Sequence, residues 1–442
     1  MNEGLQSKAR AIYDKVKDEL YLCRPNLKVG NEAYNDHLLF GILTQLNNGT
    51  QLVYGPYGGG KTTSSAYLNS MFYGLPLKVV RGAIVRGNPQ ITKHEVVGRP
   101  DYSKFSLGKE EAIWQKFCMM PPKIWDELPR TPESTQAIAL AGIEEGSWTT
   151  LNEHVYEGRR PFYATANFAD RGSNTIIPAL KDRFDIATVV GFPGLANSRA
   201  ISRRYNKEQE LILEDDGITE EAEDLMLTGK YKEVHSRLPN LRERFSGVLT
   251  SRGIPVLIDQ EKKQIDREIS EVGLDDLAEA YCTLLTAELN IPQEGDYLRN
   301  LLAQTSESRR LDQVVVRYAQ SLAWLQGREN VNLEDVLNIA PYALWHRVEW
   351  NDAVKGRGSF ATYRGADLDL RIAKAMLNEG STGAEGLKKR LEQNAGNIKE
   401  LAGLLKEGKE EEAKKLLDGI TSTGRTHPFF LDVKRELEDF EE

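Results

Sequence analysis

Residues 51–65, QLVYGPYGGGKTTSS, decide the fold of this chain. Gly55, Gly60, Lys61 and Thr62 fill the pattern G-x-x-x-x-G-K-[ST], in which a glycine-rich loop aims backbone N–H groups at phosphate oxygens. An apolar strand precedes the loop and a helix-compatible segment follows it. This context argues against the alternative explanation, a chance match to the pattern in a glycine-rich turn. We expect Lys61 to reach the β- and γ-phosphates and the Thr62 hydroxyl to hold Mg²⁺. The predicted phosphate site comprises Gly55, Pro56, Tyr57, Gly58, Gly59, Gly60, Lys61, Thr62 and Thr63.

Composition excludes several classes of protein. The three cysteines, Cys23, Cys118 and Cys282, form no C-x-x-C pair, and the six histidines do not cluster. We therefore expect a reducing cytoplasmic location and no metal held by protein side chains alone. The N-terminus is charged and helical in character rather than a signal peptide, and no run approaches the roughly 18 apolar residues of a membrane span. The net charge of −9 argues against broad non-specific binding to nucleic acid, although a basic channel inside an acidic protein stays open.

Changes of pattern along the 442 residues predict an α/β domain followed by helices. Short apolar strands alternate with helical segments in the first part, which is typical of a parallel sheet covered by helices on both faces. The strand candidates are TQLVYG (50–55), KVVRGAI (78–84), KIWDE (123–127) and FYATAN (162–167). The predicted divisions are an N-terminal helical extension (1–25), an α/β nucleotide-binding core (26–194), a charged helical insertion (195–256), an all-helical lid (257–350), a linker (351–383) and a charged helical tail (384–442).

An acidic pair follows the third strand candidate. Asp126 would hold the Mg²⁺ shell, and Glu127 would polarise an attacking water as general base. Two adjacent acidic residues more often cap a helix. The support for a catalytic role of this pair therefore comes from its position after a phosphate loop. Pro121 and Pro122 interrupt the apolar run before it, so the strand must be short.

Three further polar residues stand at positions where catalysis could use them. Asn167 ends a strand candidate and could contact the γ-phosphate or orient water; a turn-forming asparagine is the plain alternative. Arg183 could pair with a neighbouring aspartate, or enter the site of an adjacent subunit as an arginine finger. Arg310 starts a helix in the C-terminal bundle, where it could equally be an ordinary surface arginine.

The order of these motifs resembles that of an AAA+ ATPase, and the sequence segments around them are similar to those of the MoxR family. The segments that carry the resemblance are LKVGNEAYNDHLLFGILTQLNNGTQLVYGPYGGGKT, DELPRTPESTQAIALAGIEEGSWT, RPFYATANFADRGSNTIIPALKDRFD and LQGRENVNLEDVLNIAPYALWHRV. Together they cover roughly residues 26–194 and 257–348. Tyr57 departs from the family, which usually has a small residue at that position of the loop.

The resemblance implies roles for individual residues. Lys61 and Thr62 become Walker A, Asp126 and Glu127 Walker B, and Asn167 sensor 1. It implies Arg183 as a finger acting in trans, Arg310 as sensor 2, Val29 and Gly30 near the adenine, and residues 86–102 in a pore-facing insertion.

The resemblance further implies ATP and Mg²⁺ as cofactors, a homo-hexamer, a von Willebrand factor A domain protein as partner, and a protein client that is remodelled or matured. Two alternatives stay open at this stage. One is a nucleic-acid motor or restriction-associated NTPase. The other is a nucleotide-gated scaffold without turnover, against which the intact Lys61, Asp126 and Glu127 argue.

Overall fold

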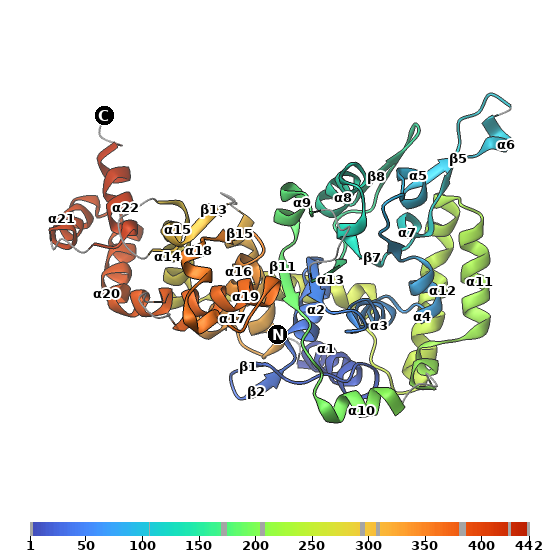
Figure 1. Ribbon diagram of the computed structural model, residues 1–442, viewed down its shortest axis with the longest axis horizontal. Helices are drawn as coiled ribbons and strands as arrows, with labels where there is room; N and C mark the ends of the chain where they lie inside the picture. The colour runs from blue at the N-terminus through green and yellow to red at the C-terminus, as the bar shows by residue number, and fades with distance from the viewer. Residues whose placement is uncertain are drawn as a thin grey trace. The chain divides into compact units, whose positions relative to one another are not determined.

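The computed structural model describes residues 3–105, 107–168, 175–203, 208–291, 297–305, 310–379, 386–422 and 426–439. The chain divides into two compact units. The first is Met1–Glu271 with Trp324–Gly327, and the second is Val272–Ala323 with Arg328–Glu442. Figure 1 follows the elements from the N-terminus in blue to the C-terminus in red. Helix α13, Asp259–Ser270, lies within the first unit. The domain boundaries expected from the sequence remain predictions.

A five-stranded parallel sheet forms the centre of the first unit. Its strands, in spatial order, are β11 Ile186–Val189, β3 Thr50–Gly55, β10 Phe162–Asn167, β7 Lys123–Asp126 and β4 Val85–Arg86. All four strand pairs are parallel, and the register places Asn167 beside Gly55. Because parallel strands end at one edge, Asp126 at the end of β7 and Asn167 at the end of β10 lie near the end of β3, at the edge where open α/β sheets bind ligands. The predicted α/β fold class is confirmed.

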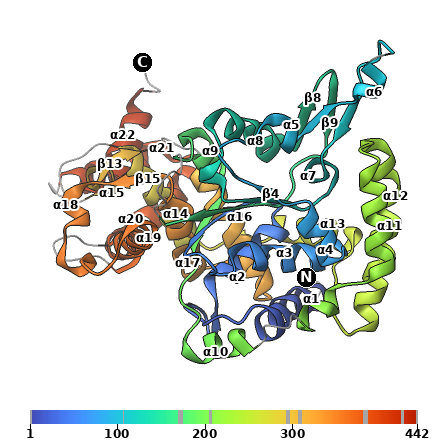
Figure 2. The ribbon, with the colours of Figure 1, turned by 45° about the vertical axis from the view of Figure 1, so that its right-hand side comes forward.

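Helices cover both faces of this sheet. Figure 2 shows α2 and α3 on one side and α8 and α9 on the other. These helices are α2 Asp36–Leu46, α3 Lys61–Tyr73, α8 Glu133–Glu145 and α9 Pro178–Arg183. Asn35 caps α2 by accepting from the Leu38 N–H, which satisfies one of the unpaired donors of the first turn.

The prediction of a strand over residues 78–84 is wrong. Residues Leu77–Gly82 form helix α4, and only Val85–Arg86 pair into the sheet. Leu77, Val79 and Val80 are all buried while Lys78 is exposed, so the burial of two consecutive residues breaks the alternation expected of a strand. The apolar content favoured a strand, but the segment packs between other helices, with contacts to α3 and α11, and is helical.

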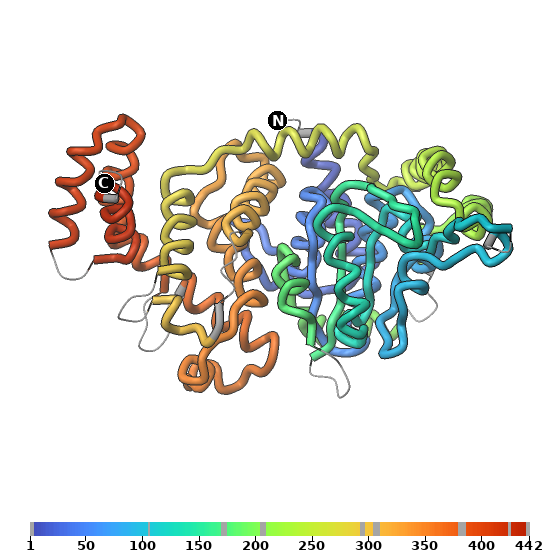
Figure 3. Tube along the Cα trace, turned by 90° about the horizontal axis from the view of Figure 1, so that it is seen from above, coloured from blue at the N-terminus to red at the C-terminus, as the bar shows by residue number. Residues whose placement is uncertain are grey.

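The remaining helices and strands complete the first unit. They are α1 Glu3–Lys15, the π-helical turn η1 Val16–Leu20, β1 Leu27–Val29, β2 Glu32–Tyr34, α5 Lys93–Val96, β5 Gly98–Pro100, α6 Tyr102–Phe105, β6 Ala112–Trp114, α7 Lys116–Met119, η2 Leu128–Arg130, β8 Ser147–Thr150, β9 Glu153–Tyr156, α10 Leu195–Arg203, η3 Glu208–Leu213, α11 Asp216–Leu227 and α12 Tyr231–Ser251. β1–β2, β5–β6 and β8–β9 are antiparallel pairs. The α11–α12 pair lies beside the β5–β6 hairpin (Figure 3), and the Trp114 N–H donates to the Gly229 carbonyl at 2.9 Å.

The second unit is mostly helical. Its elements are β12 Gly273–Leu274, α14 Asp276–Asn290, α15 Leu298–Leu301, β13 Leu302–Thr305, α16 Arg310–Leu325, β14 Asn330–Val331, α17 Leu333–Leu344, β15 Val348–Trp350, α18 Asp352–Lys355, η4 Gly358–Phe360, α19 Gly365–Lys374, η5 Ala375–Glu379, α20 Leu387–Lys406, α21 Glu410–Thr421 and α22 Pro428–Asp439. The last two residues of α16 and the two residues that follow it, Trp324–Gly327 in all, belong to the first unit. Asn332 caps α17, since its side chain accepts from the Asp335 N–H.

A buried ion pair attaches the C-terminal helices to this bundle. Glu288 of α14 is fully buried and receives two hydrogen bonds of 2.5 Å from the Arg390 guanidinium of α20. His427, just before α22, lies 3.1 Å from the same carboxylate. Burial by itself would raise the pKa of Glu288, but the hydrogen bonds from His427 and Arg390 outweigh it and hold the pKa below its usual value. The charged tail therefore packs on the bundle rather than extending away from it.

Candidate functional site

The phosphate loop connects the end of β3 to the start of α3, at the carboxyl edge of the sheet. Gly58 and Gly60 have φ angles of 71° and 76°, in the left-handed region of the backbone that residues with a Cβ rarely adopt. A Cβ on Gly55 would lie 3.0 Å from the Val190 Cβ. The glycines of the motif are thus required by the backbone itself, which supports the prediction of a loop built to approach phosphate closely.

Lys61 lies inside this loop and is buried. Its Nζ donates to the carbonyls of Gly55 at 3.0 Å and Pro56 at 2.9 Å, and to Asn167 Oδ1 at 2.8 Å. Burial lowers the pKa of Lys61, and the carboxylates of Asp126 and Glu127 oppose that shift. A phosphate oxygen is a stronger acceptor for this ammonium than a neutral carbonyl, so the lysine is placed to exchange partners when nucleotide binds.

Asp126 accepts hydrogen bonds from two hydroxyl groups. Thr62 Oγ1 donates to Asp126 Oδ1 at 2.5 Å, and Thr165 Oγ1 donates to the same oxygen at 2.6 Å. The Thr165 hydroxyl also accepts from the Glu127 N–H at 2.9 Å. Thr165 was not singled out in the sequence, because a buried threonine inside a strand carries no motif.

Hydroxyl and carboxylate oxygens are ligands that Mg²⁺ prefers. Thr62 and Asp126 therefore fit a magnesium ion that also binds phosphates and water. Within the residues that the structure describes, no group of three or more His, Cys, Asp or Glu side chains could hold a metal ion alone.

Glu127 occupies an unusual backbone position. Its φ is 53°, and it stands between β7 and the short helical turn η2. Such a conformation costs a non-glycine residue on the order of 1 kcal/mol and persists where surrounding contacts impose it. Gly87 supplies one of these contacts: a Cβ there would overlap the Glu127 carbonyl. Glu127 Oε1 accepts from Asn167 Nδ2 at 3.2 Å, so Asn167 bridges Glu127 and Lys61.

A residue of the N-terminal segment also contacts the loop. The Tyr21 hydroxyl donates to the Gly59 carbonyl at 3.2 Å, and a Cβ on Gly60 would lie 2.7 Å from the Tyr21 ring. The ring packs edge-on against His37 at 5.9 Å between centroids. Sequence reasoning placed residues 1–25 outside the site, because an isolated tyrosine after a charged helix gives no signal that it supports a loop 38 residues away.

His37 links the loop support to α3. Its Nε2 lies 2.7 Å from Ser64 Oγ, in the first turn of α3, and its Nδ1 lies 3.3 Å from Thr188 Oγ1 of β11. Complete burial lowers the pKa of His37 to about 4. The imidazole is therefore neutral at pH 7 and acts as a hydrogen-bonded structural group.

The remaining predicted residues take separate places. Val29 ends β1 and is buried, and Gly30 follows it in the β1–β2 turn with φ 57°. Arg183 ends α9, where it donates to Glu144 of α8 at 2.9 Å and to the Ala179 carbonyl at 2.7 Å. Arg310 is the first residue of α16, in the second unit. The Lys61 network thus includes Asn167 and Glu127, while Arg183 binds α8 of its own chain.

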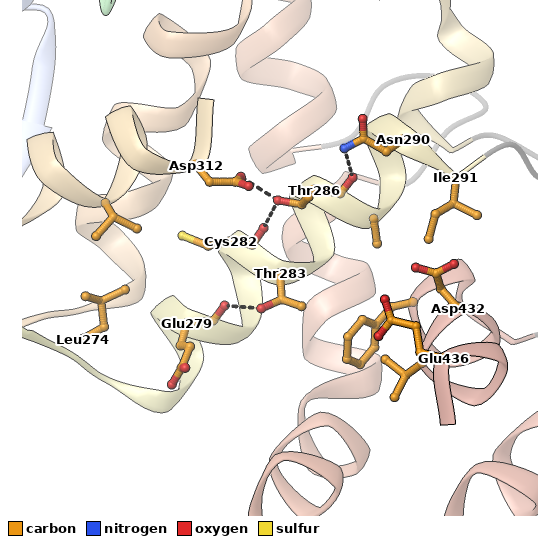
Figure 4. Close-up of a pocket in the computed structure, with 14 residues that line it drawn as sticks. Leu274, Glu279, Cys282, Thr283, Thr286, Asn290, Ile291, Asp312, Asp432 and Glu436 are labelled. Carbon is orange, nitrogen blue, oxygen red and sulfur yellow. Dashed lines mark hydrogen bonds between the residues drawn. The ribbon is translucent and has the colours of Figure 1, made fainter. Parts of the chain in front are cut away.

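The second unit contains a separate cavity of about 570 Å³ between α14, α16 and α22 (Figure 4). Its lining carries four carboxylates and also apolar side chains, among them Ile291 and Phe429. The carboxylates belong to Glu279, Asp312, Asp432 and Glu436. Burial raises the pKa of Asp312, which accepts from Thr286 Oγ1 at 2.5 Å. None of the predicted nucleotide-site residues lines this cavity.

Comparison with known proteins gives three similarities. Residues 300–364 match the family described as the AAA lid domain. A putative ATPase from Cytophaga hutchinsonii superposes with a TM-score of 0.54 at 16% sequence identity, covering 80% of this chain and 91% of that chain. The chain has the AAA+ fold. A full-length MCM homolog from Methanopyrus kandleri gives a TM-score of 0.41 at 12% identity, covering 79% of this chain and 63% of that chain, which is too low to support an argument.

A curated relative from Bacillus subtilis (strain 168), uncharacterized protein YeaC, is 23% identical over 236 residues. The aligned part spans 53% of this chain and 59% of that protein. The AAA+ fold accounts for the parallel sheet of the first unit and the helices that cover it. Among the described residues, no helix is long and apolar enough to cross a membrane.

Proposed function

We propose that this protein hydrolyses ATP and uses the energy to remodel or mature another protein, as the MoxR resemblance suggests. The observation that carries the proposal is the connected set Lys61, Asn167 and Glu127, with Thr62 on Asp126 beside it. The groups to which we assign phosphate binding, metal binding and water activation stand at one edge of one sheet. A scaffold that only binds nucleotide has no need of a carboxylate in the position of Glu127.

The residues divide the chemistry between them. The loop N–H groups and Lys61 would bind the phosphates. Thr62 and Asp126 would hold Mg²⁺, which when bound would neutralise the charge that develops on the transferred phosphoryl group. Glu127 accepts the proton of the attacking water, and Asn167 orients that water against the γ-phosphate. Lys61 moves from the Gly55 and Pro56 carbonyls to phosphate oxygens.

The proposal includes a ring of identical subunits, most simply a hexamer, with Arg183 reaching the site of its neighbour. Within its own chain Arg183 binds Glu144, whose side chain is 38% exposed, so this pair is weak enough to exchange. Arg310 would sense nucleotide from the helical lid, and Val29 and Gly30 would lie near the adenine. A von Willebrand factor A domain protein would present the client.

ATP turnover by the purified chain tests the first part. Glu127→Gln should bind ATP with unchanged affinity but lose turnover by about 100-fold or more. Persisting turnover in that variant would remove Glu127 as general base. Nucleic acid added to the wild type should leave the rate unchanged; a strong stimulation would favour a nucleic-acid motor instead.

The partner and the ring need separate tests. The Glu127→Gln variant, held with ATP, is the trap for recovering a client and a partner from its native cell. Mixing Arg183→Ala with Lys61→Ala subunits should restore some hydrolysis, because hybrid interfaces combine an intact loop with an intact arginine. No recovery in well-formed mixed rings would contradict a finger in trans.

A further inference from the structure

A tyrosine–arginine pair connects the phosphate loop to the turn after β7. Arg130 Nη2 donates to the Tyr57 hydroxyl at 3.1 Å, and Arg130 Nη1 lies 3.1 Å from Glu127 Oε2. Tyr57 is 61% exposed, so its ring is not held there by burial in a core. One guanidinium therefore touches both the loop and the carboxylate assigned as general base.

The backbone after Glu127 explains this contact. The left-handed conformation of Glu127 turns the chain into η2, and the Arg130 N–H donates to the Glu127 carbonyl at 2.9 Å. This tight turn returns Arg130 to the side of the Glu127 carboxylate. The unusual φ of Glu127 and the position of Arg130 are thus one local structure.

Both carboxylate oxygens of Glu127 have a donor. Oε1 accepts from Asn167 and Oε2 pairs with Arg130. A guanidinium stays charged and offers donors in a fixed plane, so it restricts carboxylate rotation more than a flexible ammonium does. The chain of contacts Tyr57, Arg130, Glu127, Asn167 and Lys61 begins and ends in the phosphate loop.

We propose that Arg130 is a positioning residue that holds Glu127 for proton transfer, and that Tyr57 sets the position of Arg130. This inference rests on the proposed ATP hydrolysis. A movement of the loop on nucleotide binding then reaches the general base by two connections, through Asn167 on one oxygen and through Arg130 on the other. The odd tyrosine of the loop thereby has a function. Because Arg130 and Glu127 are about one third exposed, their attraction adds little to folding stability, and substitutions there leave the fold intact.

Steady-state kinetics test the positioning role. Arg130→Gln should lower kcat about tenfold and leave KM for ATP within about twofold, because a misplaced base slows the chemical step without removing phosphate contacts. Arg130→Lys should recover part of kcat. Tyr57→Phe should lower kcat by a smaller factor, and the double variant Tyr57→Phe/Arg130→Gln should be no slower than Arg130→Gln alone. An unchanged or raised kcat in Arg130→Gln, or effects that multiply in the double variant, would overturn the proposal.

The matched control is Arg237→Gln, which removes an exposed α12 arginine that pairs with Glu221 and Glu233. Its kcat should equal that of the wild type. Hydrogen exchange of the nucleotide-free protein supplies a readout that does not depend on turnover. Amides of residues 57–60 should exchange faster in Arg130→Gln and Tyr57→Phe than in the wild type and Arg237→Gln, because the loop loses its contact with Arg130.

The two readouts separate the two proposals. If the wild type does not hydrolyse ATP, the proposed function fails, and the exchange rates still decide whether Arg130 holds the loop. If the wild type hydrolyses ATP and Arg130→Gln keeps both wild-type kcat and wild-type exchange, the proposed function stands and the role of Arg130 is overturned.

Discussion

The side chain of Asn167 accepts a hydrogen bond from Lys61 Nζ at 2.8 Å, across the pair of strands that place Asn167 beside Gly55. Its amide nitrogen simultaneously donates to Glu127 at 3.2 Å. An amide is suited to this position because it offers an acceptor to a cation and a donor to an anion.

Replacement of Asn167 tests this bridge. Asn167→Ala should lower kcat by about 100-fold, since the water and Glu127 lose a fixed donor, while ATP binding stays close to normal. Parallel measurements of turnover and of nucleotide affinity separate the effect on kcat from the effect on ATP binding. Asn152→Ala, in the exposed β8–β9 turn, is the control and should leave both values unchanged. Loss of ATP binding in Asn167→Ala with kcat intact would contradict the assignment.

The Thr62–Asp126 contact predicts a specific dependence on magnesium. Thr62→Ala should require about tenfold more Mg²⁺ for half-maximal ATP binding, because one oxygen ligand is lost. Thr62→Ser keeps the hydroxyl and should retain the wild-type midpoint. The measurement is a Mg²⁺ titration of fluorescent-nucleotide binding. Equal midpoints for alanine and wild type would exclude Thr62 from the metal shell.

Tyr21 predicts that the N-terminal segment supports nucleotide binding. Tyr21→Phe loses one hydrogen bond to Gly59 and should cost about 1 kcal/mol of stability. Tyr21→Ala also removes the ring beneath Gly60 and should weaken ATP binding further than Tyr21→Phe does. Urea unfolding and nucleotide titration of both variants measure the two effects. ATP affinity equal to wild type in Tyr21→Ala would show that the loop keeps its shape without this support.

His37 predicts a loss of stability in mild acid. Its pKa of about 4 in the folded protein lies below the ordinary value of 6.5, so between these values the unfolded chain binds a proton that the folded chain excludes. Stability therefore falls as the pH drops from about 6.5 toward 4, by about 3 kcal/mol in total from this group. It does not fall further from this group at lower pH.

The variant His37→Gln removes this dependence. The difference in unfolding free energy between pH 7 and pH 5 should be smaller in His37→Gln than in the wild type, whatever the variant costs in stability at pH 7. His235→Gln, at an exposed position of α12, should keep the wild-type difference. Identical pH differences in all three proteins would contradict a neutral buried His37.

Residues of the candidate site were accessible to sequence reasoning to different degrees. Lys61 and Thr62 were predicted from the G-x-x-x-x-G-K-[ST] pattern, and Asp126, Glu127 and Asn167 from their places at the ends of strand candidates that follow it. The structure brings their side chains together because parallel strands end at one edge of the sheet. Thr165, Tyr21 and Arg130 were not found, since each acts through a contact that no local pattern encodes. The prediction of a strand over residues 78–84 was wrong for a related reason: which of these apolar residues are buried depends on the elements packed against them.

The sequence by itself determined the phosphate loop and the order of elements around it. Backbone sterics allow few residues other than glycine at Gly58 and Gly60, and hydrophobic spacing identifies most strands and helices without knowledge of their neighbours. Only the tertiary structure decided that an N-terminal tyrosine supports this loop and that Arg130 joins Tyr57 to Glu127. Such contacts depend on side-chain directions and turn geometry summed over many residues, which a spacing pattern does not contain.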